Sequence, residues 1–196
     1  MNPASITRLD PKAYRRTPWK NGGGVTVDIA DAYAPGAAPG SWNGMLWRLG
    51  RTRIVAPGPF SDLSGYDRIL TVIGGRGLVL EIEGEAALDV REPLCPVRFR
   101  GEDRITSRLE AGPVAVLNLI SDRQHDIDVA ILSGADARSL KAEISLVYAL
   151  AGSAVAIDGN GYALAEDEAL RCDGDGMLTI GSGSVALATI SSRNAP

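Results

Sequence analysis

An eight-residue stretch near the N-terminus, Trp19 to Thr26, gathers residue types that can bind a ligand. It combines an aromatic ring, an ammonium group at Lys20, an amide at Asn21 and three consecutive glycines. Glycines adopt positive φ and let a ligand approach the main chain closely, while Lys20 and Asn21 supply hydrogen-bond donors and an acceptor. The alternative interpretation is a glycine turn between two strands, with Trp19 filling the core.

Further polar groups follow along the chain: Arg48 on a strand-like segment, Phe60-Ser61 in a turn-rich one, and Asp67-Arg68 at the start of a β-rich run. Lys20, Arg48 and Arg68 together suit one or two carboxylates, because arginine binds that group through a bidentate fork. Residues from separate strands can converge on a small molecule inside a β-barrel. In the alternative interpretation, Arg68 pairs with Asp67 or Asp62 at the surface, where such pairs contribute little to stability.

Several classes of site are disfavoured by what the sequence lacks. His125 is the one histidine of the chain, so a zinc or iron site built on imidazoles is not expected. We place His125 in a surface loop, and no G-x-S-x-G motif offers a nucleophile beside it. Cys95 and Cys172 are too sparse for a disulfide framework, and we interpret both as buried apolar residues. We therefore expect no metal and no cofactor, although carboxylate-only metal sites stay open.

Composition narrows the class of protein further. The chain has 196 residues and a formal net charge of −4, with acidic and basic residues interspersed. Because nucleic-acid binding needs a basic stripe or arm, no nucleic-acid partner is expected. No apolar run approaches the roughly 20 residues of a membrane helix, and the first residues hold no apolar signal region, so we expect no membrane partner and a cytoplasmic location.

The elements that must position the polar groups have the two-residue period of strands. Strands are predicted in a series of segments: 25–29, 45–49, 68–73, 78–82, 86–90, 114–120, 144–150, 153–158, 162–165, 177–180 and 185–190. Residues 33–43 and 56–67 are rich in glycine and proline and are predicted as loops. The one segment resembling a helix is 135–143. Short strands separated by glycine turns indicate an all-β sandwich or barrel.

The sequence also echoes itself. Residues 112–121 resemble residues 183–191 after one deletion, and residues 70–75 resemble residues 147–152. Such self-similarity indicates two β units of roughly 70 residues each.

The motifs in and after the Trp19 stretch resemble the HutD/Ves family in order and spacing. The matching segments are Trp19-Lys20-Asn21-Gly22-Gly23-Gly24-x-Thr26, Trp47-Arg48, Gly58-Pro59-Phe60-Ser61, Gly65-x-Asp67-Arg68, Phe99-x-Gly101, Gly112-Pro113-Val114 and Asn118-Leu119. The resemblance covers about residues 10–123 and is fold-level beyond them. Val25 and Val27 depart from the family pattern, where polar residues are common, and Val116 stands where an Asp is usual. The acidic end of the pocket, or its ligand, is therefore expected to differ.

The resemblance implies a bicupin, an all-β chain of two β-barrel or jelly-roll units in one subunit without a histidine-rich metal motif. Residues 1–123 would form the first barrel and residues 124–196 a smaller second barrel, with which some N-terminal strands could pair. Carried over position by position, the candidate ligand-binding residues are Trp19, Lys20, Asn21, Thr26, Arg48, Phe60, Ser61, Asp67, Arg68 and Asn118.

The family is associated with bacterial histidine utilisation, so the resemblance implies a protein that binds a small anionic metabolite of the N-formylglutamate or urocanate type. It would modulate that pathway without catalysis, and a homodimer is left open. One alternative is a metal-independent cupin enzyme, an isomerase or hydrolase of a small sugar or amino-acid derivative, with Asp67 or Lys20 as acid or base. Another is a purely structural or protein-interaction module.

Overall fold

The computed structural model describes residues 4–18 and 24–193. The chain divides into two compact units, which we call the first unit (Tyr14–Gln124) and the second unit (Met1–Ala13 with His125–Pro196). The division after Gln124 falls one residue beyond the predicted one, and residues 1–13 go with the second unit. Strands dominate the described part of both units, beside one short 3-10 helix, η1 (Pro11–Ala13). No helix in the described ranges is long and apolar enough to cross a membrane.

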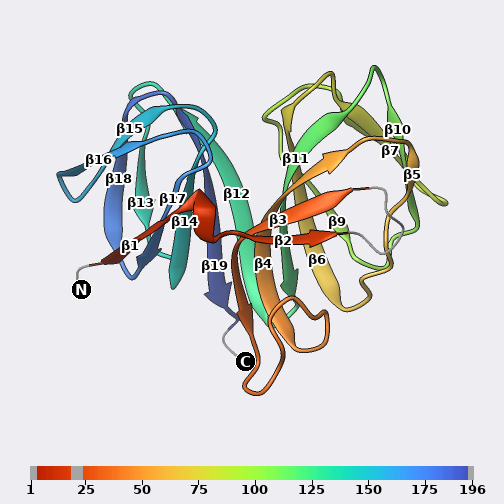
Figure 1. Cartoon of the computed structure of the whole chain (residues 1–196), viewed down its shortest axis with the longest axis horizontal. Coiled ribbons are helices and arrows are strands. Elements are labelled where there is room, and N and C mark those ends of the chain that lie inside the picture. Colours follow the sequence, from red (N-terminus) through yellow and green to blue (C-terminus); the bar gives the residue numbers. More distant parts are fainter. Residues whose placement is uncertain (1–3, 19–23, 194–196) are drawn as a thin grey trace. The chain divides into compact units, whose positions relative to one another are not determined.

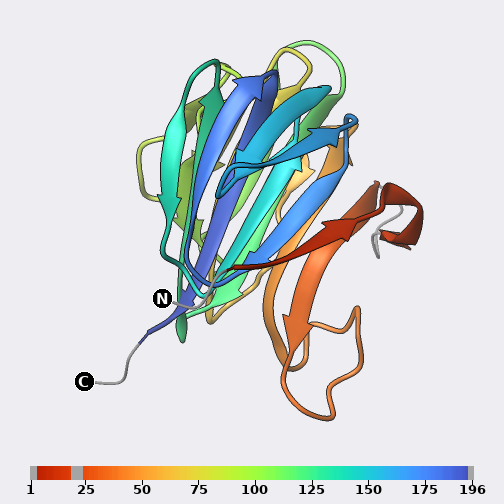
Figure 2. The same ribbon diagram turned by 90° about the vertical axis from the view of Figure 1, so that its left-hand side faces the viewer.

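The first unit consists of two antiparallel sheets. The six-stranded sheet runs in the order β2 (Arg15–Pro18), β3 (Val25–Tyr33), β4 (Met45–Ile54), β11 (Val114–Asp122), β6 (Tyr66–Gly74) and β9 (Val97–Arg100). The four-stranded sheet runs in the order β5 (Gly58–Pro59), β10 (Ile105–Leu109), β7 (Leu78–Ile82) and β8 (Leu88–Val90). The loop between β3 and β4, drawn in orange, extends beyond the ends of these strands (Figures 1 and 2).

The second unit is also built from two antiparallel sheets. Its five-stranded sheet runs in the order β1 (Ser5–Leu9), β17 (Ala169–Asp173), β14 (Ile144–Ala149), β19 (Ser184–Ser192) and β12 (His125–Ser133). Its four-stranded sheet runs in the order β13 (Ala137–Leu140), β18 (Gly176–Ser182), β15 (Ser153–Ile157) and β16 (Asn160–Leu164). The pairing of β1 with β17 ties the N-terminal strand to this unit.

The eight strands from β4 to β11 and the eight from β12 to β19 have the same neighbours in the same order. The order β4-β11-β6-β9 in the first unit matches β12-β19-β14-β17 in the second, and β5-β10-β7-β8 matches β13-β18-β15-β16. The duplication predicted from the sequence echoes is therefore confirmed at the level of strand order. With an apolar core in each unit, this is the predicted all-β bicupin fold. The first unit adds β2 and β3 beside β4, and the second adds β1 beside β17.

Alternating side chains of the sheets build the two cores, as the period of two predicts. In the first unit, Leu70, Val72 and Val116 of the larger sheet pack in one cluster with Leu78 and Leu80 of the smaller one. The second unit has a corresponding cluster, with Val147 and Leu187 from one sheet and Val155, Ile157 and Leu178 from the other. Each unit therefore has its own hydrophobic core.

The helix predicted over residues 135–143 is wrong. Asp136 accepts a hydrogen bond from the Ser133 backbone N–H at 2.8 Å, which makes a turn, and residues 137–140 then pair with β18 as strand β13. The acidic residue that resembled a helix cap thus caps a turn. The strands predicted over 25–29, 45–49, 68–73, 78–82 and 114–120 are confirmed.

Candidate functional site

The inner face of the six-stranded sheet carries an unusual number of polar side chains. In the register of this sheet, Ile120 of β11 lies opposite Arg48 of β4 on one side and opposite Arg68 of β6 on the other. Two residues earlier on β11, Asn118 lies opposite Gly50 and Leu70. Because directly paired residues share a face and alternate residues return to it, Arg48, Arg68 and Asn118 all project to the side of the core.

Arg68 is a buried cation without an acidic partner in the described part of the chain. The residue is 8% exposed, and its guanidinium carbon lies 4.9 Å from the ring centres of both Phe60 and Phe99. Burial, reinforced by the positive charge of Arg48, lowers the pKa of Arg68 to about 10. The two rings provide cation–π attraction, but a buried charge that lacks a counter-charge is costly.

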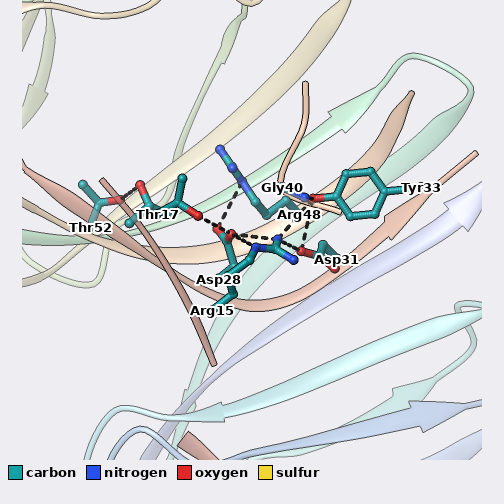
Figure 3. Close-up of polar contacts among 9 residues, drawn as sticks. Arg15, Thr17, Asp28, Asp31, Tyr33, Gly40, Arg48 and Thr52 are labelled. Atoms are coloured by element: carbon teal, nitrogen blue, oxygen red, sulfur yellow. Dashed lines mark hydrogen bonds and ion pairs between the residues drawn. The ribbon is translucent and has the colours of Figure 1, made fainter. Parts of the chain in front are cut away.

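Arg48 is buried to a similar degree, at 7% exposed, but it has an acidic neighbour. Its Nε lies 3.6 Å from Oδ1 of Asp28, a residue that is itself 4% exposed (Figure 3). Burial lowers the pKa of Arg48, and the Asp28 carboxylate opposes that shift. Arg48 therefore remains a cation held on the inner face.

Asp28 joins Arg48 to the edge strand β2. Its Oδ2 accepts hydrogen bonds from Nε and Nη2 of Arg15 at 3.0 and 2.8 Å and from the Thr17 hydroxyl at 3.2 Å (Figure 3). Arg15 also contacts the Asp31 carboxylate. Although burial acts to lower the pKa of Arg15, the hydrogen bonds that it donates to Asp31 and Asp28 raise it. The network thus fixes β2, the strand that leads into the Trp19 stretch.

Two hydroxyl groups extend the polar surface along β3 and β4. Thr26 lies opposite Thr52 in the register, and their Oγ1 atoms are 3.1 Å apart (Figure 3). On the other side of β4, Val116 of β11 lies opposite Thr52, and it is fully buried in the hydrophobic core. Val116 therefore adds an apolar side chain where the polar surface meets the core.

Three polar atoms of this inner face are buried and make no hydrogen bond to any described residue. They are Nε of Arg68, Oδ1 of Asn118 and Oδ1 of Asp28, the last of which has the ion pair with Arg48. Buried polar groups in native proteins nearly always have a partner, so a bound ligand or an ordered water is expected at these atoms. Arg68 needs an acceptor and Asn118 needs a donor. A small polar anion with a donor of its own would supply both.

A surface hollow of the first unit lies apart from these atoms. It is lined by Pro59, Phe60, Glu81, Ile82, Glu83, Arg104, Ile105 and Thr106. Phe60 is shared with the candidate site, but the lining includes neither arginine of the inner face. Its acidic rim does not suit an anion. Within residues 4–18 and 24–193, no group of three or more His, Cys, Asp or Glu side chains could hold a metal ion.

Comparison with known proteins decides the family. The sequence model of the HutD family matches residues 11–188 of the chain. The chain belongs to the HutD family. It is 37% identical over 120 residues to an uncharacterized 21.2 kDa protein of the hutC 3′ region of Pseudomonas putida. That match spans 60% of this HutD-family chain and 58% of the relative, which is less than two thirds of the relative's length.

Solved structures agree with this assignment. HutD from Pseudomonas fluorescens SBW25, solved in a formate condition, is 31% identical and superposes with a TM-score of 0.82 over 97% of this chain and 100% of that one. A bacterial pirin from Escherichia coli in complex with nickel(II) gives a TM-score of 0.63 over 97% of this chain and 100% of that one, at 10% identity. The second likeness shows the cupin fold alone.

The structure brings part of the predicted set together. Thr26, Arg48, Arg68 and Asn118 lie on the inner face, and Phe60 stacks on Arg68. Trp19, Lys20 and Asn21 lie outside the described residues. Ser61 follows Phe60 in an exposed segment.

Asp67 does not join the site. As the neighbour of Arg68 on β6, it projects to the opposite face, where its Oδ1 accepts a hydrogen bond from Arg123 at 3.2 Å. Asp62 accepts hydrogen bonds from Ser64. The alternative in which Arg68 pairs with Asp67 or Asp62 at the surface is therefore wrong, because Arg68 is buried against aromatic rings instead.

Several residues of the site were missed in the sequence. The alternation in residues 25–29 places Asp28 on the same face as Thr26, which was a usable signal. Arg15 and Asp31 contact the candidate site or its network through strand pairing, the Tyr33 hydroxyl contacts both of them, and Trp42 contacts Arg48 from a loop. No local pattern marks these four residues.

The predictions for the two cysteines and the histidine are confirmed in part. Cys172 is buried as predicted, but Cys95 is exposed, so that prediction is wrong for Cys95. His125 is the first residue of β12, where it pairs with Ser192, and not part of a loop.

Proposed function

We propose that this HutD-family chain binds a small carboxylate-bearing metabolite on the inner face of the six-stranded sheet, and that it modulates histidine utilisation by doing so without transforming the ligand. Membership of the HutD family and similarity to a protein of the hutC 3′ region support the pathway. The residues that would hold the metabolite are Arg68, Arg48 and Asn118, with Thr26 and Phe60 beside them.

Arg68 is the observation that carries the proposal. It is buried, its guanidinium carbon lies 4.9 Å from the ring centres of Phe60 and Phe99, and it has no acidic partner among the described residues. A carboxylate that reached it would supply the missing counter-charge and the acceptor that Nε lacks. The free energy spent in burying the cation would then be recovered on binding, which is a reason for a protein to keep such a residue.

Asn118 limits the classes of ligand that suit the site. Its buried Oδ1 needs a hydrogen-bond donor. N-formylglutamate offers an amide N–H and urocanate an imidazole N–H, each in a molecule that also carries carboxylate. A protein that holds such an intermediate lowers its free concentration, which is the proposed form of modulation.

Isothermal titration calorimetry with N-formyl-L-glutamate, urocanate and histidine would test this function. We expect the wild type to bind at least one of the first two, and Arg68→Ala to weaken that binding roughly 10- to 100-fold, the range for a lost charge-assisted hydrogen bond. Arg104→Ala is the matched control, since Arg104 is an exposed arginine of the same unit paired with Glu83. If Arg68→Ala bound its best ligand as tightly as the wild type, the assignment of the site would be abandoned.

The enzyme alternative is not supported by the position of Asp67. That carboxylate projects away from Arg68 and is engaged by Arg123. On the inner face, Asp28 is held by Arg15, Thr17 and Arg48. A carboxylate engaged by three side chains is poorly placed to take a proton from a ligand. Binding without catalysis is therefore the function we propose.

A further inference from the structure

The loop between β3 and β4 brings an aromatic ring onto the candidate site. Trp42 lies in this loop, in a segment that the sequence presented as glycine- and proline-rich. Its ring centre lies 4.1 Å from the guanidinium carbon of Arg48. The two residues differ in exposure, since Trp42 is 36% exposed and Arg48 is 7% exposed. The indole therefore lies between Arg48 and solvent on one side.

Two tyrosines hold the loop in this position. The Tyr66 hydroxyl lies 3.0 Å from the backbone oxygens of Trp42 and of Met45, and the Tyr66 ring meets the indole edge to face at 6.3 Å. Two residues before Trp42, the Gly40 backbone N–H donates a hydrogen bond to the Tyr33 hydroxyl at 2.7 Å (Figure 3). Gly40 has a φ of +86°, which favours glycine. Trp42 is thus fixed by contacts far away in the sequence.

The stacked indole leaves one direction open to a ligand of Arg48. The guanidinium carbon of Arg48 lies over the Trp42 ring, and its Nε lies 3.6 Å from Oδ1 of Asp28. No described residue accepts a hydrogen bond from Arg48, whose terminal N–H groups lie in the guanidinium plane. A carboxylate binds arginine in this plane, through two parallel hydrogen bonds. Stacking and in-plane binding are therefore compatible.

We propose that Trp42 is a positioning residue for ligand binding, whose ring orients Arg48 and excludes water from it, so that a carboxylate meets the edge of the guanidinium. This inference rests on the proposed carboxylate-binding function and deepens it. Arg68 also lies against aromatic rings, those of Phe60 and Phe99, each at 4.9 Å. Both cations of the inner face are then held by aromatic rings and present their edges to the ligand.

The first readout is affinity, with N-formyl-L-glutamate and urocanate as the probes in calorimetry. Trp42→Leu should weaken binding of the better probe roughly tenfold, within the range of a partly desolvated cation–π contact, and Trp42→Phe should restore most of it. Val55→Ala is the control, because Val55 is an exposed apolar residue of the same unit outside the site. It should bind like the wild type.

The second readout needs no ligand. Phenylglyoxal modifies accessible guanidinium groups, and peptide mass spectrometry reports the rate for each arginine. Removing the indole should speed the modification of Arg48 severalfold in Trp42→Leu, whereas Arg68, which lies under other rings, should keep its rate. Thermal unfolding of each variant distinguishes a loss of ligand affinity from a loss of folding. If Trp42→Leu is unstable, Trp42→Phe provides a milder substitution.

The outcomes separate the two proposals. If the wild type binds a probe and Trp42→Leu binds it equally well, or Val55→Ala loses as much affinity as Trp42→Leu, the role of Trp42 is refuted while the binding function stands. If the wild type binds neither probe, the proposed function fails. An unchanged rate of Arg48 modification in Trp42→Leu would also overturn the positioning role.

Discussion

The two units share one strand order but fill it with different chemistry. The strand pair β11–β4 of the first unit corresponds to β19–β12 of the second, and the pair Val114–Ile54 corresponds to Val185–Leu132. Four residues along, the first unit has Asn118 opposite Gly50, and the second unit has Thr189 opposite Asp128. The place of Arg48 is likewise taken by Asp126, an exposed carboxylate paired with Arg193 at 2.6 Å. At these positions, the second unit has no counterpart of the cationic inner face.

This difference between the units distinguishes the residues that the fold needs from those that would bind a ligand. A two-sheet unit needs an apolar interior, and Val147, Leu170 and Leu187 provide it in the second unit. Nothing in that requirement calls for Arg68, whose burial disfavours folding. The first unit therefore carries charges that its architecture does not need, and function is assigned to residues grafted on the fold.

The largest effect should come from breaking the network around Asp28. Asp28→Asn would leave Arg15 and Arg48 without their shared carboxylate, and the free energy of unfolding should fall by roughly 2–4 kcal/mol, as for other broken buried ion pairs. Urea denaturation measures this change. Asp126→Asn is the control in the second unit, where an exposed ion pair should contribute little. Equal effects of the two substitutions would remove the contrast between the units.

A change of opposite sign is expected at Arg68. Arg68→Met replaces a buried, uncompensated cation with an apolar side chain of similar length, so the free energy of unfolding should rise by roughly 1–2 kcal/mol while the proposed carboxylate binding weakens. The pKa of Arg68 is lowered to about 10 in the folded chain from 12.5. Above pH 10 the unfolded chain therefore binds more protons, and wild-type stability gains relative to the variant. The advantage of Arg68→Met should shrink there.

Denaturation of both proteins at pH 7 and at pH 10.5 would measure this difference. A variant less stable than the wild type at pH 7 would mean that the Phe60 and Phe99 rings compensate the burial of the cation fully, and that the first unit carries no stability cost for binding.

How far the sequence predicted this site depends on the kind of contact. Arg48 and Arg68 were marked in the sequence as cations on strand-like segments, and Asn118 by the resemblance to the HutD/Ves family. The two-residue period of strands accounts for the face that each of these side chains takes. The same rule excludes Asp67, which was grouped with Arg68 as a motif although strand neighbours project to opposite faces. Trp42 could not be found this way, because its contacts depend on where a loop closes.

The network around Asp28 could not be predicted from local sequence patterns either. Arg15 reaches Asp28 because β2 pairs with β3, in a register that places these two residues opposite each other. Pairing of that kind is a tertiary fact that hydrophobic periodicity does not contain. The predicted helix over residues 135–143 failed for a similar reason, since pairing with β18 outweighs the weak helical pattern.

The smallest effect concerns the two thiols, one in each unit. Cys95 is exposed, whereas Cys172 on β17 packs inside the second-unit core. Burial raises the pKa of Cys172 to about 12 from 9.0, with Asp173 and Asp158 adding to the shift. At pH 8, a thiol reagent such as 5,5′-dithiobis(2-nitrobenzoate) should therefore label Cys95 in the native chain at once and Cys172 only after unfolding.

The raised pKa of Cys172 also fixes a direction for stability. Between pH 9 and pH 12 the folded chain keeps a thiol proton that the unfolded chain releases, so the contribution of Cys172 to the free energy of unfolding falls as pH rises. Cys172→Ala should remove that slope, and Cys95→Ala, the matched control, should leave it. Immediate labelling of both thiols in the native chain would show that the second unit opens readily. The contrast between a closed apolar interior in the second unit and the proposed ligand-binding face of the first would then be wrong.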